Sequence, residues 1–401
     1  MLSVRQAQAR ILAKVHRLPE ERVDTVSAFG RVLASPVIAK RDLPPVDNSA
    51  MDGYAVRAVD VPNADAELPV RGIVAAGDRP GLHLEAQSAV AIMTGAPLPH
   101  GADAVILRED AIAQGDRVRF SEVARVGQHV RRSGEDVSVG QEVIAAGSRL
   151  GPGELAMLAS QGLATVAVIR RPRVSIVCTG SELCPLGQEP EAGQIISSNE
   201  HALAAQVEAA GGVIVRRTLV GDELAAIEAA LADALADSDV VVSSGGVSVG
   251  DFDHVREALG AVGVATDFWK VAMRPGKPMV FGTSRAGAPL FGLPGNPVSS
   301  MVSFELFVRP ALLALQGARV LYRPRIQVSL ASPVSKRPGR TLFVRAALDT
   351  TGAQVLAHPH SKQGSGMLSS LVGVDALVEI DADQGDQAAG AVLPAILTRW
   401  S

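Results

Sequence analysis

The chain has 401 residues, which is enough for two to four domains of roughly 100–200 residues each. Hydrophobic residues make up 47% and charged residues 20%, so disorder through a shortage of core-forming residues is excluded. The formal net charge of −4 argues against a general binder of nucleic acid or of anionic membranes. Any anion site must therefore be a local concentration of cations.

The cysteines and the apolar segments predict a soluble cytoplasmic protein without membrane contact. Cys178 and Cys184 form neither a CxxC pair nor a disulfide framework, which is typical of a reducing compartment. The first 14 residues lack the apolar core of a signal peptide. The most apolar stretch, 155–169, is interrupted by Gln161 and its neighbours and falls short of the roughly 18 apolar residues that a membrane span needs.

The first 172 residues predict helices at both ends of a β-rich region. Ser3 and Gln6 form a capping-box pattern at the start of a helix over 3–16, and a second short helix is expected over 27–33. Short apolar runs separated by Gly, Pro and Asp then indicate strands and many turns. A helix over 153–161 and a strand over 164–169 follow. The strands expected in the β-rich region are 70–74, 89–93, 104–107, 117–120 and 142–144.

From Arg173 to about Gly317, strands alternate with helices. Apolar strands are expected at 174–178, 213–215 and 240–242, and helices that begin at Asn199, Glu223 and Asp253. This alternation predicts a parallel sheet covered by helices. The remainder returns to short strands, which predict a small β-domain. These last strands are expected at 326–330, 342–344 and 377–380.

Three loops should meet at one edge of the parallel sheet. Ligands of such sheets bind outside the carboxyl ends of the strands, where we expect 179–182, 243–253 and 292–299. The middle loop combines glycines and hydroxyls with the start of a helix, which are the ingredients of a phosphate cradle. It is neither a Walker A nor a GxGxxG loop, and taken alone it is as compatible with a tight turn. Three such loops at one edge favour a binding site.

A cationic cluster follows the sheet in this slightly acidic chain. Lys270, Arg274 and Lys277 can hold phosphate or another oxyanion, although solvated cations at a strand end are the commoner case. Pro275 and Pro278 favour the binding site because they restrict the backbone that carries the cations.

Carboxylates lie along the same predicted edge. Glu182, Asp222, Asp251 and Asp253 could hold Mg²⁺ beside a phosphate, with the remaining ligands from water and substrate. Each of them could instead cap a helix, and Asp253 is expected to do so in any case.

Seven segments, in order from residue 47 to residue 299, carry a family pattern. They are DNSAMDGYA at 47–55, IMTGAP at 92–97, RSGED at 132–136, TGSEL at 179–183, SGGVSVG at 244–250, AMRPGKP at 272–278 and GLPGNPVS at 292–299. With them the chain resembles the molybdopterin molybdenumtransferases, the family of MoeA and the gephyrin E domain. Arg274 departs from the pattern because many members have Lys there.

The resemblance implies a multi-domain α/β plus β fold. It consists of a three-layer α/β/α pterin-binding domain with a mainly parallel sheet, a β-rich N-terminal lobe and a small C-terminal β-domain. The expected bounds are 1–44 with 140–172 for an N-terminal linker and dimerisation region, 45–139 for the β-rich lobe, 173–320 for the α/β molybdopterin-binding domain and 321–401 for the C-terminal β-domain.

The resemblance also implies a reaction and partners. The family inserts molybdate into the dithiolene of adenylylated molybdopterin and releases AMP, assisted by Mg²⁺. It implies a homodimer whose active site lies between the α/β domain of one subunit and the N-terminal lobe of the other. A molybdopterin adenylyltransferase and molybdoenzymes are further expected partners.

Most of the expected site residues lie in the matched segments, and Asp222, Asp253, Lys270, Arg345 and Ser365 lie outside them. Those expected in catalysis are Asp52, Glu182, Asp222, Asp253, Lys270 and Arg274, and Glu182, Asp222 and Asp253 are also the expected Mg²⁺ ligands. Those expected to bind substrate are Thr94, Thr179, Gly180, Ser181, Ser244, Gly245, Gly246, Ser248, Gly250, Lys277, Pro294, Pro297, Ser299, Arg345 and Ser365. By the family's pattern, Arg345 and Ser365 join Lys277 and Ser299 in holding molybdate.

Two alternatives remain open at this point. A molybdopterin adenylyltransferase acts one step earlier and resembles the α/β domain alone, so the additional N-terminal half argues against it. A scaffold of the gephyrin kind would carry a fused adenylyltransferase domain and a long linker, which nothing in this sequence resembles.

Overall fold

The computed structural model describes residues 1–246 and 254–398, and the chain divides into two compact units. Unit 1 comprises Met1–Ser35, Ala146–Gly151 and Thr165–Ser401, and unit 2 comprises Pro36–Ala145 and Pro152–Ala164. The finer domain bounds expected from the sequence stay a prediction.

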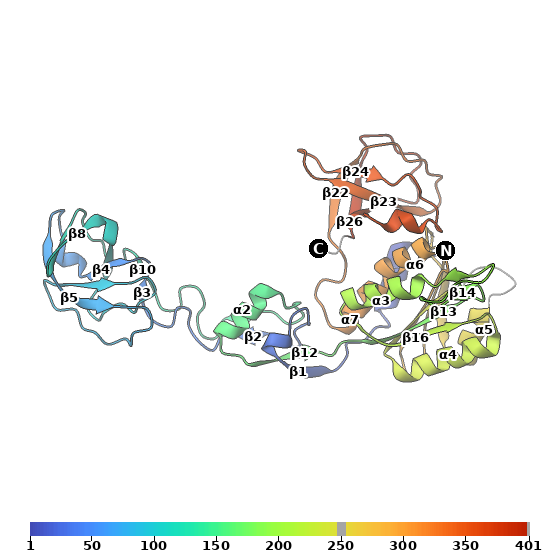
Figure 1. The fold of residues 1–401 in the computed structure, drawn as a ribbon, viewed down its shortest axis with the longest axis horizontal. Helices are drawn as coiled ribbons and strands as arrows, with labels where there is room; N and C mark the ends of the chain where they lie inside the picture. The colour runs from blue at the N-terminus through green and yellow to red at the C-terminus, as the bar shows by residue number, and fades with distance from the viewer. Residues whose placement is uncertain (247–253, 399–401) are drawn as a thin grey trace. The chain divides into compact units, whose positions relative to one another are not determined.

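Unit 2 is built around a six-stranded sheet in the order β7-β4-β6-β5-β9-β8, drawn in blue to cyan in Figure 1. The predicted strands of this sheet are confirmed, and β4 and β8 are additions that the sequence pattern did not predict. Gly53 explains the miss of β4, because β4 packs so closely on β7 that a Cβ at Gly53 would lie 2.0 Å from the Ile106 carbonyl oxygen. The strands are β4 Gly53–Val56, β5 Glu67–Val74, β6 Ala89–Ile92, β7 Ala104–Leu107, β8 Ala111–Gln114 and β9 Arg117–Phe120.

Smaller elements complete unit 2. The helix α2 (Pro152–Ser160) has the predicted position, and Gly162 follows it with a left-handed φ of +70°. The buried side chain of Gln161 accepts hydrogen bonds from the backbone N–H groups of Lys40 and Arg41. The two-stranded sheets are β2 Val37–Ile38 with β11 Glu142–Ile144, and β3 Asn48–Ser49 with β10 Val130–Arg131; the 3₁₀ turns are Ala58–Asp60 and Arg108–Asp110.

The N-terminal part of unit 1 corrects one prediction. The helix α1 (Val4–Leu12) begins at Ser3 with the expected capping box. The helix expected over 27–33 is absent from this described segment, which instead contains a 3₁₀ turn, Thr25–Ser27, followed by Gly30 at a φ of +73°. That left-handed glycine ends the turn, and Val32 and Leu33 form β-bridges to Arg149 and Val168. The strands β1 (Glu20–Asp24) and β12 (Thr165–Ile169) pair antiparallel.

The centre of unit 1 is a six-stranded sheet between two helical layers. Its order is β16-β13-β17-β21-β20-β18. The first four of these strands are parallel, β20 is antiparallel to β21, and β18 is antiparallel to β20. Alternate residues of β17 face opposite layers: Val242 packs in the core with α3 and α6, and Val241 in the core with α4 and α5. Figure 1 shows these helix pairs on the two sides of the sheet.

The elements of this layered region follow the predicted alternation. The helices are α3 Asn199–Ala209, α4 Leu224–Asp237, α5 His254–Ala261, α6 Pro297–Ser303, a π-helical turn Phe304–Val308 and α7 Arg309–Leu315. The strands of the sheet are β13 Arg173–Thr179, β16 Val213–Val220, β17 Val240–Ser244, β18 Ala265–Lys270, β20 Pro278–Thr283 and β21 Pro289–Leu293. A separate small sheet consists of β14 Leu183–Cys184 and β15 Ile195–Ile196.

One apolar helical run passes the length and hydropathy test for a membrane span among the described residues. This run, Pro297–Leu315, has a mean hydropathy of 1.5, but 83% of its most apolar window is buried inside the structure. It is therefore a core helix of the α/β region.

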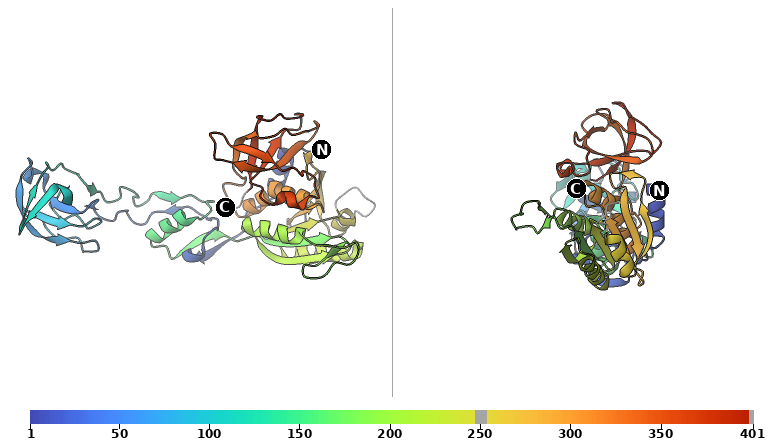
Figure 2. Two further views of the ribbon diagram at one scale, coloured as in Figure 1. Left: turned by 45° about the horizontal axis from the view of Figure 1, so that its top comes forward. Right: turned by 90° about the vertical axis from the view of Figure 1, so that its right-hand side faces the viewer.

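The C-terminal region forms a barrel, drawn in orange to red on the α6 side of the sheet in Figures 1 and 2. Five strands close on themselves because β23 pairs with β25 as well as with β24. A short strand of the α/β region, β19 (Met273–Arg274), adds in parallel to β23 and brings the cationic segment to the barrel. The barrel elements are β22 Arg325–Leu330, β23 Thr341–Asp349, β24 Leu356–Pro359, a 3₁₀ turn Leu368–Leu371, β25 Ala376–Ile380 and β26 Val392–Leu397.

Candidate active site

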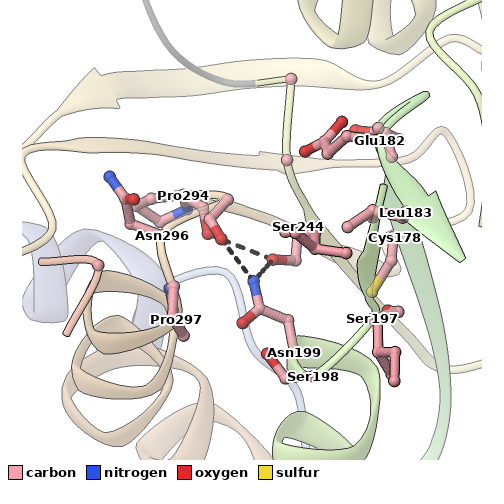
Figure 3. A pocket seen from close by; sticks show the side chains of 18 of the residues that line it. Cys178, Glu182, Leu183, Ser197, Ser198, Asn199, Ser244, Pro294, Asn296 and Pro297 are labelled. Atoms are coloured by element: carbon pink, nitrogen blue, oxygen red, sulfur yellow. Dashed lines mark hydrogen bonds between the residues drawn. The ribbon is translucent and has the colours of Figure 1, made fainter. Parts of the chain in front are cut away.

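A cavity of about 930 Å³ opens at the carboxyl edge of the parallel strands. We call it the edge cavity; the loops after β13, β17 and β21 line it, as predicted, together with the start of α3 and two barrel residues (Figure 3). The structure thus brings together nine of the predicted site residues. They are Thr179, Gly180, Glu182, Asp222, Ser244, Gly245, Gly246, Pro294 and Pro297.

The glycine pair after β17 lies directly against β13. Gly245 has a φ of +106°, and a Cβ there would lie 2.2 Å from the carbonyl oxygen of Thr179. Gly246 has a φ of +59°, and a Cβ there would meet Val255 at 2.5 Å. Only glycine fits such a conformation at such distances. Beneath the pair, the Thr179 Oγ1 is buried and has no hydrogen-bond partner among the described residues. Ser248 and Gly250 of the same predicted loop lie outside the described residues.

Two predicted carboxylates line the edge cavity. The Glu182 carboxylate folds over Gly180, where a Cβ would lie 2.5 Å from Oε2. Asp222 and Ser181 hold each other: the Ser181 N–H donates to Asp222 Oδ2 at 2.9 Å, and the Asp222 N–H donates to Ser181 Oγ at 3.1 Å. Asp253, the third predicted metal ligand, lies outside the described residues.

The number of carboxylates suits Mg²⁺ and not a metal that is held by three or more protein ligands. The described part of the chain contains no group of three or more His, Cys, Asp or Glu that could hold a metal ion by themselves. Mg²⁺ in phosphate-binding sites is held by one or two carboxylates together with substrate phosphates and water. Glu182 and Asp222 fit that donor set.

A second cavity of about 300 Å³, the cationic pocket, adjoins the edge cavity and shares Pro278, Pro294 and Asn296 with it. It contains four predicted residues from three segments that are distant in sequence. They are Arg274, Lys277, Ser299 and Ser365. The backbone turns at Gly276, which has a φ of +97° and whose Cβ would lie 2.6 Å from Ser303 Oγ. Lys270 is half-buried at the end of β18, where it pairs with Pro278, and it lines neither of these two cavities.

Comparison with known proteins identifies the family. Three family models match in order: the MoeA N-terminal region (domain I and II) at residues 2–162, a probable molybdopterin binding domain at 175–314, and the MoeA C-terminal region (domain IV) at 327–398. The chain is 39% identical to the molybdopterin molybdenumtransferase 2 of Mycobacterium tuberculosis over 98% of both chains. It is 35% identical to the molybdopterin molybdenumtransferase of Haemophilus influenzae over 97% of both. The chain belongs to the MoeA family.

A solved structure agrees with this membership. The molybdopterin biosynthesis MoeA protein of Pyrococcus horikoshii superposes with a TM-score of 0.87 at 30% identity, covering 99% of this chain and all of that one. The predicted fold class and the predicted enzyme class, a molybdopterin molybdenumtransferase, are therefore confirmed. The matches over nearly the full length also argue against the adenylyltransferase alternative, which covers only the α/β region.

In this MoeA-family chain, Arg345 lies behind the cationic pocket. Its side chain is fully buried: Nε donates to Ser370 Oγ at 2.8 Å, and Nη2 donates to the carbonyl oxygens of Lys362 at 3.1 Å and Gly364 at 3.3 Å. Nη1 has no partner among the described residues. Desolvation by burial lowers the pKa of the guanidinium to about 10. Arg345 thus fixes the loop that carries Ser365.

Asp52 and Thr94 lie together in unit 2. The backbone N–H and the hydroxyl of Thr94 both donate to Asp52 Oδ1, at 2.6 and 2.7 Å. These hydrogen bonds, the one from the backbone first, hold the pKa of the Asp52 carboxyl below its ordinary value of 3.8. Both residues are exposed, so the pair presents an ionised carboxylate to solvent.

Asn199 is a residue of the edge cavity that the sequence pattern did not indicate. Its side-chain Nδ2 donates to Ser244 Oγ at 2.9 Å and to the Gly295 carbonyl oxygen at 2.7 Å, and Ser244 Oγ donates to the Pro294 carbonyl oxygen at 3.2 Å (Figure 3). Asn199 therefore joins the start of α3 to the end of β17 and to the loop after β21. The available signal was an Asn at a helix start on the predicted ligand edge of the sheet.

The edge cavity also has an apolar wall that the sequence pattern did not indicate. Leu183 of β14, Ile195 and Ile196 of β15, and Leu368 of the barrel line it. These strands have two residues each, too short for a periodicity signal. Cys178 lines the cavity too, but burial raises the pKa of its thiol to about 12, so the thiol stays protonated and is a poor nucleophile.

Proposed function

We propose that the edge cavity binds adenylylated molybdopterin, that the cationic pocket holds molybdate, and that the chain joins the two with release of AMP. The observation that carries the proposal is the shared wall of the two cavities at Pro278, Pro294 and Asn296. A cavity with close-packed glycines and carboxylates thereby adjoins a small pocket of cations and hydroxyls.

The edge cavity suits the phosphate-bearing substrate. The close approach of Gly245 and Gly246 to β13 exposes backbone there, and the unpartnered Thr179 hydroxyl lies beneath them. Phosphate oxygens accept hydrogen bonds from such backbone N–H groups and hydroxyls. The apolar wall that includes Ile195 and Ile196 gives a flat heteroaromatic ring a surface to lie against.

The cationic pocket suits a tetrahedral dianion. Lys277 and Arg274 supply charge, and Ser299 and Ser365 supply hydroxyl donors from two other segments. The backbone that carries the two cations is fixed by the packing of Gly276 and by the pairing of β19 with β23, so little backbone reorganisation is needed when an oxyanion binds. Placing molybdate beside a diphosphate brings together two anions that repel each other in water, and this positioning is the main catalytic contribution. Water attacks the phosphoanhydride, so AMP leaves and molybdopterin keeps its own phosphate. The two dithiolene thiols bond to molybdenum through sulfur and give their protons to one molybdate oxygen, which departs as water.

Glu182 and Asp222 would hold Mg²⁺ in the edge cavity. When bound there, Mg²⁺ would neutralise charge on the phosphoanhydride. Asp222 is oriented for this by its reciprocal hydrogen bonds with Ser181. Asp253 is expected to contribute as well.

The family pattern supports a homodimer in which Asp52 and Thr94 serve the edge cavity of the partner subunit. It also supports a cytoplasmic location and contacts with a molybdopterin adenylyltransferase and with molybdoenzymes. Mixing Asp52→Ala with Glu182→Ala subunits tests the shared site, because some mixed dimers should then contain one site with both residues intact. Activity that does not recover on mixing contradicts the shared geometry.

The function is tested by supplying adenylylated molybdopterin, molybdate and Mg²⁺ and measuring AMP together with the molybdenum cofactor. We expect equal amounts of both. Lys277→Ala should lose the response to molybdate and keep the affinity for molybdopterin. AMP release without cofactor, or no AMP at all, contradicts the proposal.

A further inference from the structure

A third cavity lies on the other side of Arg274, at the edge of the barrel. It has a volume of about 650 Å³ and is lined by Arg274 and by the loop that precedes β23, with Arg337 and Arg340. We call it the barrel-edge cavity. The pairing of β19 with β23, which sets Arg274 opposite Leu342, fixes the two cationic segments side by side.

The guanidinium groups of the barrel-edge cavity have no acidic partner. In the described ranges, no ion pair joins Arg274, Arg337 or Arg340 to a carboxylate. The one carboxylate of the lining, Asp386, accepts the backbone N–H of Lys336 at 2.6 Å and so closes the loop. The Lys336 ammonium is nearly buried and donates to the carbonyl oxygens of Ala382 and Gln384. Three arginines of one concave site thus have no ion-pair partner among the described residues, and Asp386 is the single carboxylate of the lining.

Such a site has a clear chemical preference. Guanidinium forks bind the oxygens of tetrahedral oxyanions through paired hydrogen bonds, and they do so better than ammonium groups. The Ser335 hydroxyl adds a neutral donor to the same lining. A chain with a net charge of −4 gives no general reason to concentrate unpaired cations here.

We propose that the barrel-edge cavity is a second anion site, which binds a tetrahedral dianion through Arg274, Arg337 and Arg340. Arg274 and Arg340 also line the cationic pocket, so the two sites are contiguous. The site goes beyond the proposed function, no step of which uses Arg337. Its dianion is either a free inorganic oxyanion or the phosphate of a nucleoside monophosphate.

Arg337 separates this site from the others because it lines only the barrel-edge cavity of the three, whereas Lys277 lines only the cationic pocket. The experiment is calorimetric titration of the full chain with inorganic phosphate, with molybdate and with AMP. The variants are Arg337→Ala, Arg337→Lys and Lys277→Ala, with Arg79→Ala as a control. Arg79 is exposed and lines none of the three cavities.

We expect Arg337→Ala to remove one dianion per chain from the binding stoichiometry, or to weaken that site at least about tenfold. Arg337→Lys should restore part of the affinity, and Arg79→Ala should match the wild type. A stoichiometry that also falls for AMP assigns the site to a phosphomonoester, and one that falls only for the inorganic ions assigns it to a free oxyanion. An unchanged stoichiometry and affinity in Arg337→Ala overturns the proposal.

Failure of the proposed function gives a different result. If Lys277→Ala transfers molybdenum normally, the cationic pocket is not the molybdate site and the proposed function fails. The binding measured in Arg337→Ala still decides whether the barrel-edge cavity is an anion site. The Arg337 side chain is exposed, so its replacement is not expected to unfold the chain.

Discussion

The Asn199 side-chain Nδ2 donates a hydrogen bond of 2.9 Å to Ser244 Oγ and a second, of 2.7 Å, to the Gly295 carbonyl oxygen. One amide group at the start of α3 therefore joins the end of β17 to the loop after β21. Both segments line the edge cavity, so the shape of the cavity depends on the two hydrogen bonds that Asn199 donates.

Asn199→Asp should disturb the edge cavity without a change in side-chain size. It removes both donors and directs a carboxylate toward the Gly295 carbonyl oxygen, which repels it. The Ser244 hydroxyl can donate to the carboxylate only by giving up its hydrogen bond to the Pro294 carbonyl oxygen. We expect a loss of about 1–3 kcal/mol in the free energy of unfolding and weaker binding of molybdopterin. Urea unfolding and a binding titration measure the two effects. Asn63→Asp is the control at an exposed position; equal effects of the two variants would contradict the role of Asn199.

Gly245→Ala tests the close packing of the phosphate cradle. A Cβ at Gly245 would lie 2.2 Å from the Thr179 carbonyl oxygen, so backbone must move in addition to the strain of a φ of +106°. Gly287→Ala is a matched control, since its φ is +85° and nothing lies within 4 Å of the added Cβ. We expect the control to lose about 1 kcal/mol of stability and Gly245→Ala to lose clearly more, together with activity. Equal losses in thermal unfolding would show that the backbone strain alone matters.

Local sequence pattern predicted most of the fold but only part of the site. The alternation of 174–178, 213–215 and 240–242 with helices identified the parallel sheet and hence the ligand edge, because buried strands and amphipathic helices leave periodic signals. The helix expected over 27–33 failed at Gly30, whose left-handed φ no periodicity reveals.

The missed parts of the site share a physical cause. Asn199, the two-residue strand β15 and the buried contacts of Arg345 acquire their roles from segments that are distant in sequence. The family pattern predicts that Arg345 binds molybdate. In the structure its Nε donates to Ser370 Oγ, and its Nη2 donates to the Lys362 and Gly364 carbonyl oxygens on the loop that carries Ser365.

Thr94→Val should raise the pKa of Asp52. The Thr94 hydroxyl and backbone N–H stabilise the ionised carboxylate, and the variant keeps only the backbone donor. The pKa should therefore rise part of the way toward 3.8, measured by the carboxyl carbon shift in an NMR titration. Because the folded pKa is the lower one, the stabilisation is present above the unfolded pKa and is lost as the pH falls through the folded pKa. An unchanged Asp52 titration would exclude the hydroxyl as a donor.

Arg345→Lys separates charge from geometry behind the cationic pocket. Lysine retains a positive charge but cannot reach Ser370 Oγ and the carbonyl oxygens of Lys362 and Gly364 at once, so the Ser365 loop loses its support. We expect the KM for molybdate to rise about tenfold or more, by analogy with other losses of charged hydrogen bonds, while the affinity for molybdopterin changes little. Arg79→Lys is the control for the same exchange at an exposed position outside the three cavities, and its KM for molybdate should match that of the wild type. If Arg345→Lys instead weakens molybdopterin binding and leaves the KM for molybdate unchanged, the barrel loop serves the edge cavity and not the cationic pocket.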